Sequence, residues 1–370
     1  MTSSSLPLVQ RSLGRCGITV PALGIGCWAI GGPADNLGLP MGWSTGGCES
    51  AAIAGLETAW SLGARLFDTA DVYGLGRSER LLGRLAAQVP RRDIVLVSKV
   101  GYLTDDAAEH AFAPDHMRRR LEQTLTHLGT DHLDIYFLHN ANFGPDDRWL
   151  EPAAEAMRAF QREGLITAIG MRGPHRFARD RIDAAPSRRG DKITRFQEVF
   201  AAVEPQVLAV RDNLLSPPGR AEGIFAFAER HRVGVLINKP LGQGLLTGAY
   251  DAAALRAFGP GDHRARKAWF TDPGALTLIA DGLQELHALV GPHRQDVIRI
   301  ALWACLERYA HAAVLVGFTT AEQVRQNLTA LGEPPHPDVI AQARAIMGRV
   351  QEKLDARGEV FTDEKTGAAR

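Results

Sequence analysis

Lysine is scarce in this chain. The 370 residues include 42 lysines and arginines, and only six of these are lysines. Such a bias toward arginine is typical of a GC-rich genome, and it makes the position of each lysine informative. The 42 basic residues are balanced by 42 acidic ones. A net charge of zero gives no global field toward nucleic acid or an anionic membrane, so neither partner is expected.

Cysteine and long apolar runs are also rare. The four cysteines form no CxxC pair and no metal-ligand spacing with histidine, which excludes a disulfide framework and predicts no metal site. The first residues lack the apolar stretch of a secretory signal. No run approaches the length of about 18 apolar residues that suggests a membrane span. The chain is therefore predicted to be a cytoplasmic globular protein without a membrane partner.

What the chain does contain is a regular alternation of short apolar runs and longer amphipathic segments. This pattern predicts βαβ units and a parallel sheet. Eight such units fit a closed (β/α)8 barrel, a TIM barrel, better than an open sheet, and such barrels can exceed 300 residues as one domain. The predicted strands are residues 22–25, 65–67, 94–97, 133–138, 166–171, 207–210, 233–237 and 313–316. The predicted helices are residues 49–61, 78–87, 115–128, 152–163 and 221–230.

Three other segments complete the predicted organisation. A hairpin-like segment around residues 14–17 is expected to cap the floor of the barrel. Residues 173–202 and 250–273 interrupt the alternation and are expected to be long loops at the C-terminal mouth, where long loops commonly form lids or binding loops. The prediction is one α/β domain over residues 1–360, followed by a polar tail over residues 361–370.

Ionisable residues follow three successive predicted strands. Asp68 ends the second strand and Tyr73 follows it, Lys99 ends the third strand, and His139 ends the fourth. Each one alone has an ordinary structural explanation: a turn former, a solvated lysine, a core histidine. Together they meet where such barrels place their active sites, at the C-terminal ends of the strands.

These residue types suit acid catalysis on a carbonyl group. A lysine beside a tyrosine favours the phenolate and lowers the phenol pKa from about 10. A carboxylate can hold the lysine, and a neutral imidazole can orient a substrate carbonyl toward the tyrosine. The pattern therefore predicts a tyrosine general acid.

The ordered set of motifs resembles the aldo-keto reductase superfamily over nearly the whole chain. The matching segments are LGIGCWAIGG, FDTADVYGLGRSERLLG, VLVSKVG, DHLDIYFLHN, KPLGQGLLTG and VLVGFTTAEQVRQNL. The resemblance implies a nicotinamide cofactor that lies across the barrel mouth and donates hydride to an aldehyde or ketone. It implies that Tyr73 protonates the carbonyl oxygen and that Lys99 tunes Tyr73. Asp68 would hold Lys99, and His139 would orient the substrate.

The resemblance also implies which residues contact the cofactor and the substrate. The expected cofactor contacts are Cys27, Trp28, Asp68, Arg172, Asn238, Lys239, Pro240, Leu241, Gly242, Gly244, Gly317, Phe318, Thr319, Gln323 and Asn327. The expected substrate pocket consists of Trp28, Tyr73, His139 and Arg172. No GxGxxG element follows a strand, so a Rossmann domain has no support.

NADP(H) is the expected cofactor, with NAD(H) as the alternative. The superfamily mostly uses NADP(H), and Arg325 lies in the helix expected to hold the adenosine half. Against this, Gln323 stands where some relatives have a phosphate-binding arginine. An arginine fork on phosphate is a strong contact, so its absence weakens the preference.

Several positions depart from the superfamily pattern. Arg172 and Gly173 replace a common Ser-Asn pair, and Ala209, Asp212 and Asn238 replace a common Gln, Tyr and aromatic residue. For Arg172 three explanations stay open: an ion pair with Asp212, a contact with the nicotinamide amide, or recognition of an anionic group of the substrate.

The predicted function is an oxidoreductase that reduces a small aldehyde or ketone, or oxidises the corresponding alcohol. It includes the possibility of a dedicated biosynthetic reductase for a sugar-derived ketone or an imine, because the long loops suit a specialised pocket. The alternative is a regulatory module that binds the cofactor with little turnover. The presence of all four candidate catalytic residues favours the enzyme. Nothing in the sequence predicts the oligomeric state.

Overall fold

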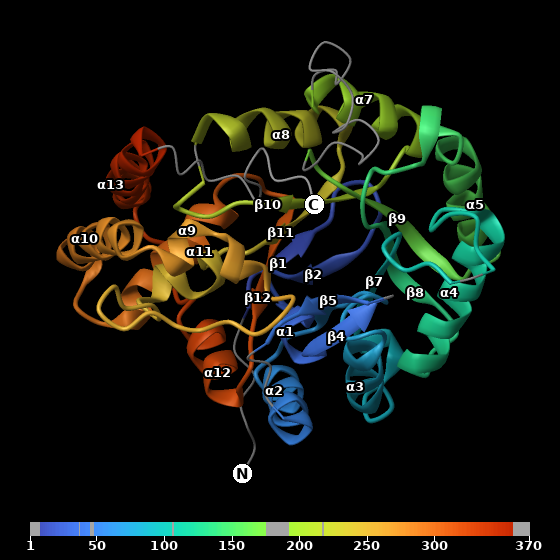
Figure 1. Ribbon diagram of the computed structural model, residues 1–370, viewed down its shortest axis with the longest axis horizontal. Coiled ribbons are helices and arrows are strands. Elements are labelled where there is room, and N and C mark those ends of the chain that lie inside the picture. Colours follow the sequence, from blue (N-terminus) through green and yellow to red (C-terminus); the bar gives the residue numbers. More distant parts are fainter. Residues whose placement is uncertain are drawn as a thin grey trace.

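The computed structural model describes residues 8–357 except residues 37, 45–47, 106, 175–191 and 217. Within that part, eight parallel strands close into one barrel (Figure 1). In barrel order they are β3 (Leu23–Gly26), β6 (Leu66–Asp68), β7 (Val95–Val100), β8 (Leu133–Leu138), β9 (Ile166–Arg172), β10 (Val207–Arg211), β11 (Gly234–Asn238) and β12 (Ala312–Gly317). The predicted TIM barrel is therefore confirmed, and each predicted strand coincides with one of these eight.

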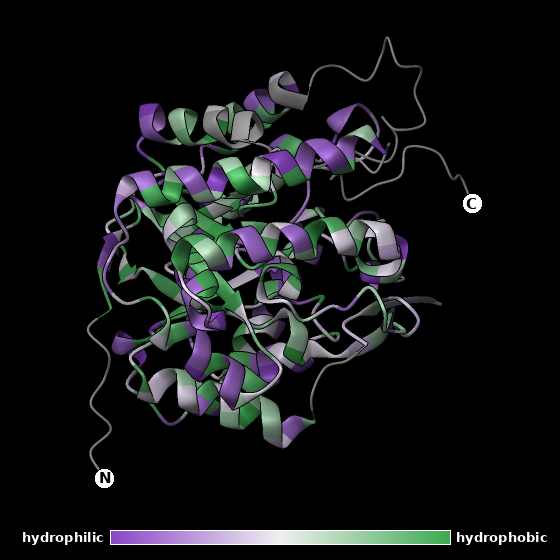
Figure 2. Ribbon diagram, turned by 90° about the vertical axis from the view of Figure 1, so that its left-hand side faces the viewer, coloured by the Kyte–Doolittle hydropathy of each residue, from purple (hydrophilic) through white to green (hydrophobic). Residues whose placement is uncertain are grey.

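The helices form a ring around the barrel (Figure 1). They are α2 (Glu49–Ser61), α3 (Arg77–Ala86), α4 (Pro114–Leu128), α5 (Leu150–Arg162), α7 (Lys192–Val203), α8 (Pro218–His231), α10 (Pro273–Val290), α11 (Arg294–Leu306), α12 (Ala321–Thr329) and α13 (Pro337–Ala356). Their surfaces alternate between polar and apolar stripes (Figure 2). The apolar stripes cover the outside of the strands, as expected for helices that bury one face. No helix in the described part of the chain is long and apolar enough to cross a membrane.

The barrel interior has its own apolar core. Val97, Ile135 and Phe137 contribute to it from neighbouring strands, and all three are fully buried. At the N-terminal end of the strands, β1 (Gln10–Ser12) and β2 (Thr19–Pro21) pair as an antiparallel hairpin. Leu13 in its turn belongs to the same interior core. The predicted cap on the barrel floor is thus confirmed, and the closed floor leaves the opposite end, the mouth, as the open one.

Of the two predicted loop insertions, one is partly wrong. Residues 192–203 form α7, because Phe196, Val199 and Phe200 repeat at helical spacing and are buried. The rest of that insertion, residues 175–191, lies outside the described residues, as does the predicted tail at 361–370. Residues 250–273 do form a long connection, interrupted by the short helices η5 (His263–Arg266) and α9 (Ala268–Thr271).

Candidate active site

The candidate catalytic residues lie together at the mouth. Asp68 is the last residue of β6, Lys99 lies one residue before the end of β7, and His139 follows β8. Tyr73 lies in the turn between β6 and α3. Because neighbouring parallel strands end at the same level, these side chains share one wall of the cavity.

Lys99 and Asp68 form a buried ion pair. The Lys99 ammonium lies 2.6 Å from Asp68 Oδ1 and donates to the Thr69 carbonyl oxygen at 2.5 Å. The exposed fractions of the two side chains are only 6% and 9%. The ammonium also lies 5.0 Å from the centroid of the Tyr73 ring. The lysine is therefore fixed between a carboxylate and the candidate acid.

A close backbone contact positions Tyr73. The turn after β6 packs against α1 (Trp28–Gly31), and Gly74 has a φ of +62°. A β-carbon on Gly74 would lie 2.2 Å from the Gly31 carbonyl oxygen, and one on Gly31 would lie 2.8 Å from the Tyr73 carbonyl carbon. Two glycines are thus needed for this contact. The Tyr73 ring then stands 5.8 Å from the His139 ring, at an angle of 72°.

The pKa of the Tyr73 hydroxyl is raised, which differs from the sequence-based expectation. Burial raises it, the positive charge of Lys99 lowers it, and the charge of Asp68 raises it again. Burial outweighs the lysine because the ammonium is largely neutralised by Asp68. For Lys99, burial lowers the pKa, but Asp68 and Tyr73 raise it above its usual value. Tyr73 is therefore protonated and Lys99 charged near neutral pH, which is the state a proton donor needs.

A buried polar network supports the catalytic wall from behind. The Glu79 carboxylate on α3 accepts hydrogen bonds from Ser98 of β7 and Thr124 of α4, both at 2.8 Å, and contacts His127 Nδ1 at 2.9 Å. Ser98 is the residue before Lys99. The network thus ties two helices to the strand that carries the lysine. Sequence reasoning missed it, because partners 19 to 48 residues away from Glu79 show no local pattern.

The catalytic wall opens into a cavity of about 930 Å³. Many of the residues that line it were not predicted, and several of these lie in the 250–273 connection and in the antiparallel hairpin of β4 (Pro33–Asn36) and β5 (Leu39–Gly42). Among them are Met41, Trp43, Tyr102, Gln243, Tyr250, Arg256, His263, Arg264, Arg266, Lys267 and Arg294. The aromatic and basic residues of the segment FGPGDHRARKAWF are the sequence feature that could have indicated these cavity-lining positions.

Four residues, which we call the clasp, join the 250–273 connection to the end of the β4–β5 hairpin across the mouth. They are Trp43, Ser44, Asp262 and Arg264. Asp262 accepts hydrogen bonds from the Ser44 hydroxyl at 2.9 Å and from Arg264 Nη2 at 2.6 Å. The Arg264 guanidinium lies 3.4 Å from the centroid of the Trp43 ring, and its side chain is only 2% exposed. The clasp roofs the cavity beside Trp28, whose ring lies 5.2 Å from that of Trp43.

We expect Asp262→Ala to open the clasp. The change removes the acceptor of both Ser44 and Arg264 and leaves a buried guanidinium without its carboxylate. Such a loss costs about 3 kcal/mol. Native-state hydrogen exchange at the backbone amides of Ser44 and Arg264 should show a free energy of protection that is lower by about this amount. Asp251→Ala, which removes an exposed carboxylate of the same connection, should leave protection unchanged. Equal protection in both variants would contradict the role of Asp262.

The clasp should also persist at neutral pH. Burial alone would raise the pKa of the Asp262 carboxyl, but donations from Arg264 and Ser44 hold that pKa well below its usual range. A depressed pKa in the folded state means stabilisation that is present above the unfolded pKa and lost as pH falls through the folded one. Only strong acid should therefore weaken the clasp.

Most of the expected cofactor contacts line the cavity on the side of β11, β12 and α12. They are Asn238, Lys239, Pro240, Leu241, Gly244, Gly317, Phe318, Thr319, Gln323 and Asn327. Lys239 has a φ of +60°, and its carbonyl oxygen is held by the Asn213 amide at 3.0 Å. A non-glycine residue held in this region is a strained feature of the kind that clusters at ligand sites. A wall with lysine and amide groups at strand ends fits a dinucleotide with anionic phosphates.

Two of the residues expected to contact the cofactor, Cys27 and Gly242, do not line the cavity. Cys27 is fully buried and does not line the cavity, because its side chain packs into the hydrophobic core. Its neighbours Gly26 and Trp28 line the cavity instead. Gly242 is also absent from the lining, since it makes a buried turn with a φ of +57° against Leu245.

The ion pair considered for Arg172 and Asp212 is also wrong. Asp212 is fully buried and accepts a hydrogen bond from Arg308 Nε at 3.1 Å, with Arg344 at 4.0 Å. Arg308 lies just after α11 and Arg344 lies on α13, so the Asp212 side chain turns away from the cavity. Arg172 instead lines the cavity, where Nη1 donates to the Tyr102 hydroxyl at 3.2 Å and to the His139 carbonyl oxygen at 3.4 Å.

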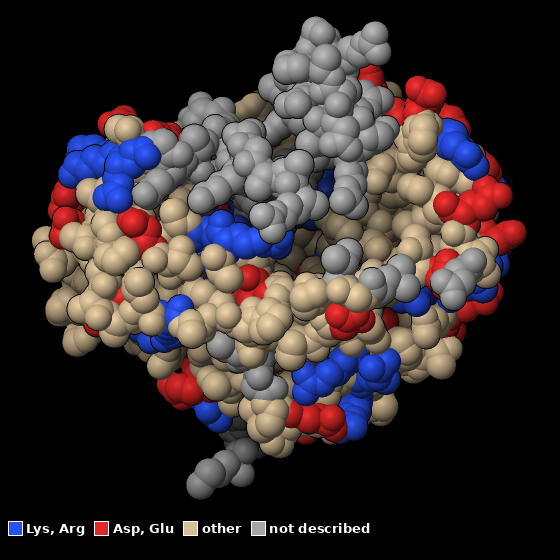
Figure 3. All heavy atoms as spheres, viewed as in Figure 1, with Lys and Arg blue, Asp and Glu red and all other residues tan. Residues whose placement is uncertain are grey.

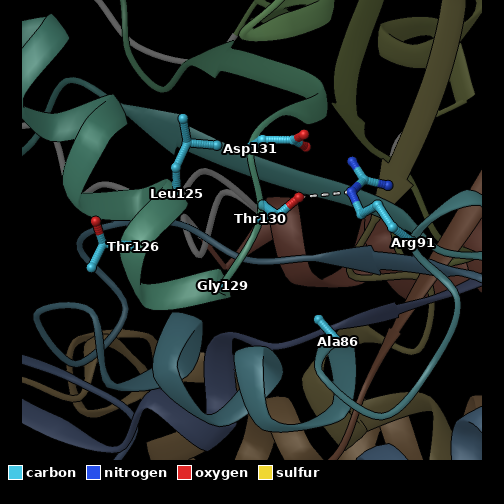
Figure 4. A pocket seen from close by; sticks show the side chains of 7 residues that line it. All are labelled: Ala86, Arg91, Leu125, Thr126, Gly129, Thr130 and Asp131. Carbon is cyan, nitrogen blue, oxygen red and sulfur yellow. Dashed lines mark hydrogen bonds between the residues drawn. The ribbon is translucent and has the colours of Figure 1, made fainter.

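A second hollow, of about 610 Å³, lies at the opposite end of the barrel (Figure 4). It is formed by the ends of α3 and α4 and by residues just before β7 and β8. Its Arg91 donates to Thr130 Oγ1 and Asp134 Oδ2, both at 2.8 Å. The guanidinium thus ties two connections together, which is a structural role.

Comparison with known proteins agrees with this geometry. The sequence model of the Aldo/keto reductase family matches residues 22–347. The chain belongs to the aldo/keto reductase family. An NADH-specific methylglyoxal reductase of Escherichia coli (strain K12) is 29% identical to it, over 86% of this chain and 92% of that protein. An L-galactose dehydrogenase of Arabidopsis thaliana is 26% identical, over 87% and 88% of the two chains.

Solved structures share the fold of this aldo/keto reductase. A glycerol dehydrogenase from Gluconobacter oxydans superposes with a TM-score of 0.69 at 21% identity, and covers 94% of this chain and 96% of its own. The holo form of an aldo-keto reductase from Bacillus halodurans gives a TM-score of 0.64 at 22% identity, over 93% and 96%. The family membership makes this chain an oxidoreductase that uses a nicotinamide cofactor.

Proposed function

We propose that this aldo/keto reductase reduces an aldehyde or ketone, or oxidises the alcohol, with Tyr73 as the general acid. When bound, the reduced nicotinamide supplies a hydride to the carbonyl carbon. The Tyr73 hydroxyl donates its proton to the carbonyl oxygen, which completes the alcohol. The observation that carries the proposal is the Asp68–Lys99 pair beside a half-buried tyrosine at the mouth.

The other residues of the wall have supporting roles. The Lys99 ammonium stabilises the phenolate that remains after proton transfer, and Asp68 keeps the ammonium in place. His139 stands edge-on to Tyr73 and can orient the substrate carbonyl. Trp28 and the clasp exclude water from one side of the cavity. Few cysteines, together with the free thiols of the described cysteines, support a cytoplasmic enzyme.

The cofactor preference proposed here differs from the first expectation of NADP(H). Arg325 does not support a preference for NADP(H), because its side chain is exposed beside Glu322 and does not line the cavity. Gln323 accepts a hydrogen bond from the Thr319 backbone N–H at 2.7 Å, so neutral groups occupy this end of the cavity. A 2′-phosphate gains most from an arginine fork. The NADH-specific relative from Escherichia coli points the same way. We propose that NAD(H) and NADP(H) are both accepted, with dissociation constants of the same order.

The experiment combines binding and turnover. We expect the dissociation constant of NADH to lie within about tenfold of that of NADPH, a ratio equivalent to 1.4 kcal/mol. Both would be measured by quenching of protein fluorescence. Tighter binding of NADPH by a hundredfold or more would contradict the proposal.

Turnover separates the enzyme from a regulatory module. Mixing the protein with reduced cofactor and a panel of aldehydes, including methylglyoxal, should consume the cofactor in proportion to alcohol formed. Cofactor binding without consumption, over the whole panel and in both directions, would favour the module.

A further inference from the structure

Arg172 is held in the cavity by one edge of its guanidinium. It is the last residue of β9 and is half-buried. Both of its hydrogen bonds to described residues leave from Nη1, toward the Tyr102 hydroxyl and the His139 carbonyl oxygen. Tyr102 stands edge-on to the His139 ring, at a centroid distance of 4.7 Å. The guanidinium therefore lies beside the imidazole proposed to orient the substrate, and neither Nη2 nor Nε donates a hydrogen bond to a described residue.

The charges around the cavity are strongly unbalanced. Its described lining contains eight lysine and arginine side chains but a single carboxylate, Asp68, which already forms an ion pair with Lys99. Lysine and arginine atoms are also visible along the edge of the central hollow in Figure 3. Arg172 forms no ion pair with a described residue. Removing a charge from water is unfavourable unless the charge is paired, so an anionic ligand would stabilise this half-buried guanidinium.

One strand of the barrel, β10, separates Arg172 on β9 from Lys239, which follows β11. Lys239 follows β11 and Arg294 begins α11, whereas Arg172, Tyr102 and His139 come from β9, β7 and β8. The register partner of Arg172 on β10 is Ala209, which also lines the cavity. Its short side chain leaves space beside the guanidinium.

Electrostatics agrees with a position next to the reacting groups. Burial raises the pKa of Tyr73 and of Asp68, and the charge of Arg172 is among the influences that oppose this rise in both groups. The guanidinium thus acts on the catalytic pair itself.

We propose that Arg172 binds an oxyanion of the substrate, so that the preferred substrate is an aldehyde or ketone that also carries a carboxylate or phosphate group. This rests on the proposed reductase function and specifies its substrate class. A guanidinium fork pairs with either group through two parallel hydrogen bonds. The carbonyl end of the same molecule would then face Tyr73 and His139.

Matched substrates test the proposal. We would compare kcat/KM for 4-oxobutanoate with that for its methyl ester, and for glyceraldehyde 3-phosphate with that for glyceraldehyde. The wild type should prefer the anionic member of at least one pair by about tenfold to a hundredfold. The substrate pair with the larger ratio shows whether the enzyme prefers a carboxylate or a phosphate group. In Arg172→Gln that ratio should fall at least tenfold, mainly through KM, and Arg172→Lys should retain part of it.

Arg266→Gln is the matched control, because Arg266 also lines the cavity but is exposed. Its ratio should stay close to that of the wild type. Thermal melting and the dissociation constant of the cofactor would be measured for every variant. An equal loss of preference in Arg266→Gln would overturn the assignment to Arg172. So would weaker cofactor binding in Arg172→Gln at an unchanged ratio, which would place Arg172 on the nicotinamide.

The two proposals fail in different ways. A wild type that reduces neutral aldehydes without preferring the anionic members overturns the substrate class and leaves the reductase standing. A wild type that reduces none of the four compounds with either cofactor counts against the reductase itself.

Discussion

Tyr73→Phe should lower kcat by about 10²–10⁴-fold, the usual contribution of a positioned general acid. The substitution keeps the ring that stacks edge-on against His139 and removes only the hydroxyl. The proton for the carbonyl oxygen then has to come from water, in a cavity partly roofed by the clasp. Steady-state reduction of the best aldehyde of the panel would measure the loss.

Cofactor binding separates a chemical role from a structural one. The Tyr73 hydroxyl is needed only when the carbonyl oxygen gains its charge, so the dissociation constant of the cofactor should change less than about threefold. Tyr102→Phe is the matched control, because Tyr102 presents a hydroxyl to the same cavity but lies 39% exposed beside Arg172. It should keep far more activity on a neutral aldehyde than Tyr73→Phe does. Similar activity in the two variants would contradict Tyr73 as the acid.

The parts of the molecule that follow local rules could be predicted from the sequence. The predicted strand at residues 133–138 matches β8, and the predicted helix at residues 49–61 matches α2, residue for residue. A buried strand is a short apolar run and an amphipathic helix has its own period, so each is written in consecutive residues. Strand order then followed from alternation, because a βαβ unit places successive strands side by side.

The contacts that depend on distant residues could not be predicted. An ion pair between Asp212 and Arg172, which end neighbouring strands, is one of the three explanations that the sequence leaves open, yet the Asp212 carboxylate binds Arg308, 96 residues later. The clasp joins Ser44 to Asp262 over 218 residues. No local pattern encodes such pairs. The burial of the Cys27 side chain could not be predicted for a different reason. A shift of one residue at a strand end decides whether a side chain faces the cavity or the core.

Lys99→Met should cost both activity and stability. The methionine has a similar length but leaves the Asp68 carboxylate buried without a counter-charge, and a broken buried pair costs about 3–5 kcal/mol. At the same time Tyr73 loses the cation that opposes the effect of burial, so the pKa of Tyr73 should rise further above its usual value. Alcohol oxidation needs the phenolate, so its pH–rate profile should shift to higher pH, with kcat at pH 8 reduced by about 10²-fold or more.

The double variant Asp68→Asn/Lys99→Met separates the two effects. Removing both charges takes away the unpaired carboxylate, so the free energy of unfolding should recover most of what Lys99→Met loses. Activity should not recover, because Tyr73 still lacks its cation.

Urea unfolding and the pH–rate profile of both variants would be measured together. An unchanged profile in Lys99→Met would contradict the coupling of Lys99 to Tyr73, whereas recovery of activity in the double variant would show that the lysine serves only to neutralise Asp68. Because Asp68 and Tyr73 raise the pKa of Lys99 above its usual value although burial lowers it, the lysine charge should contribute stability throughout the neutral range and lose that contribution only as pH rises through the lysine pKa.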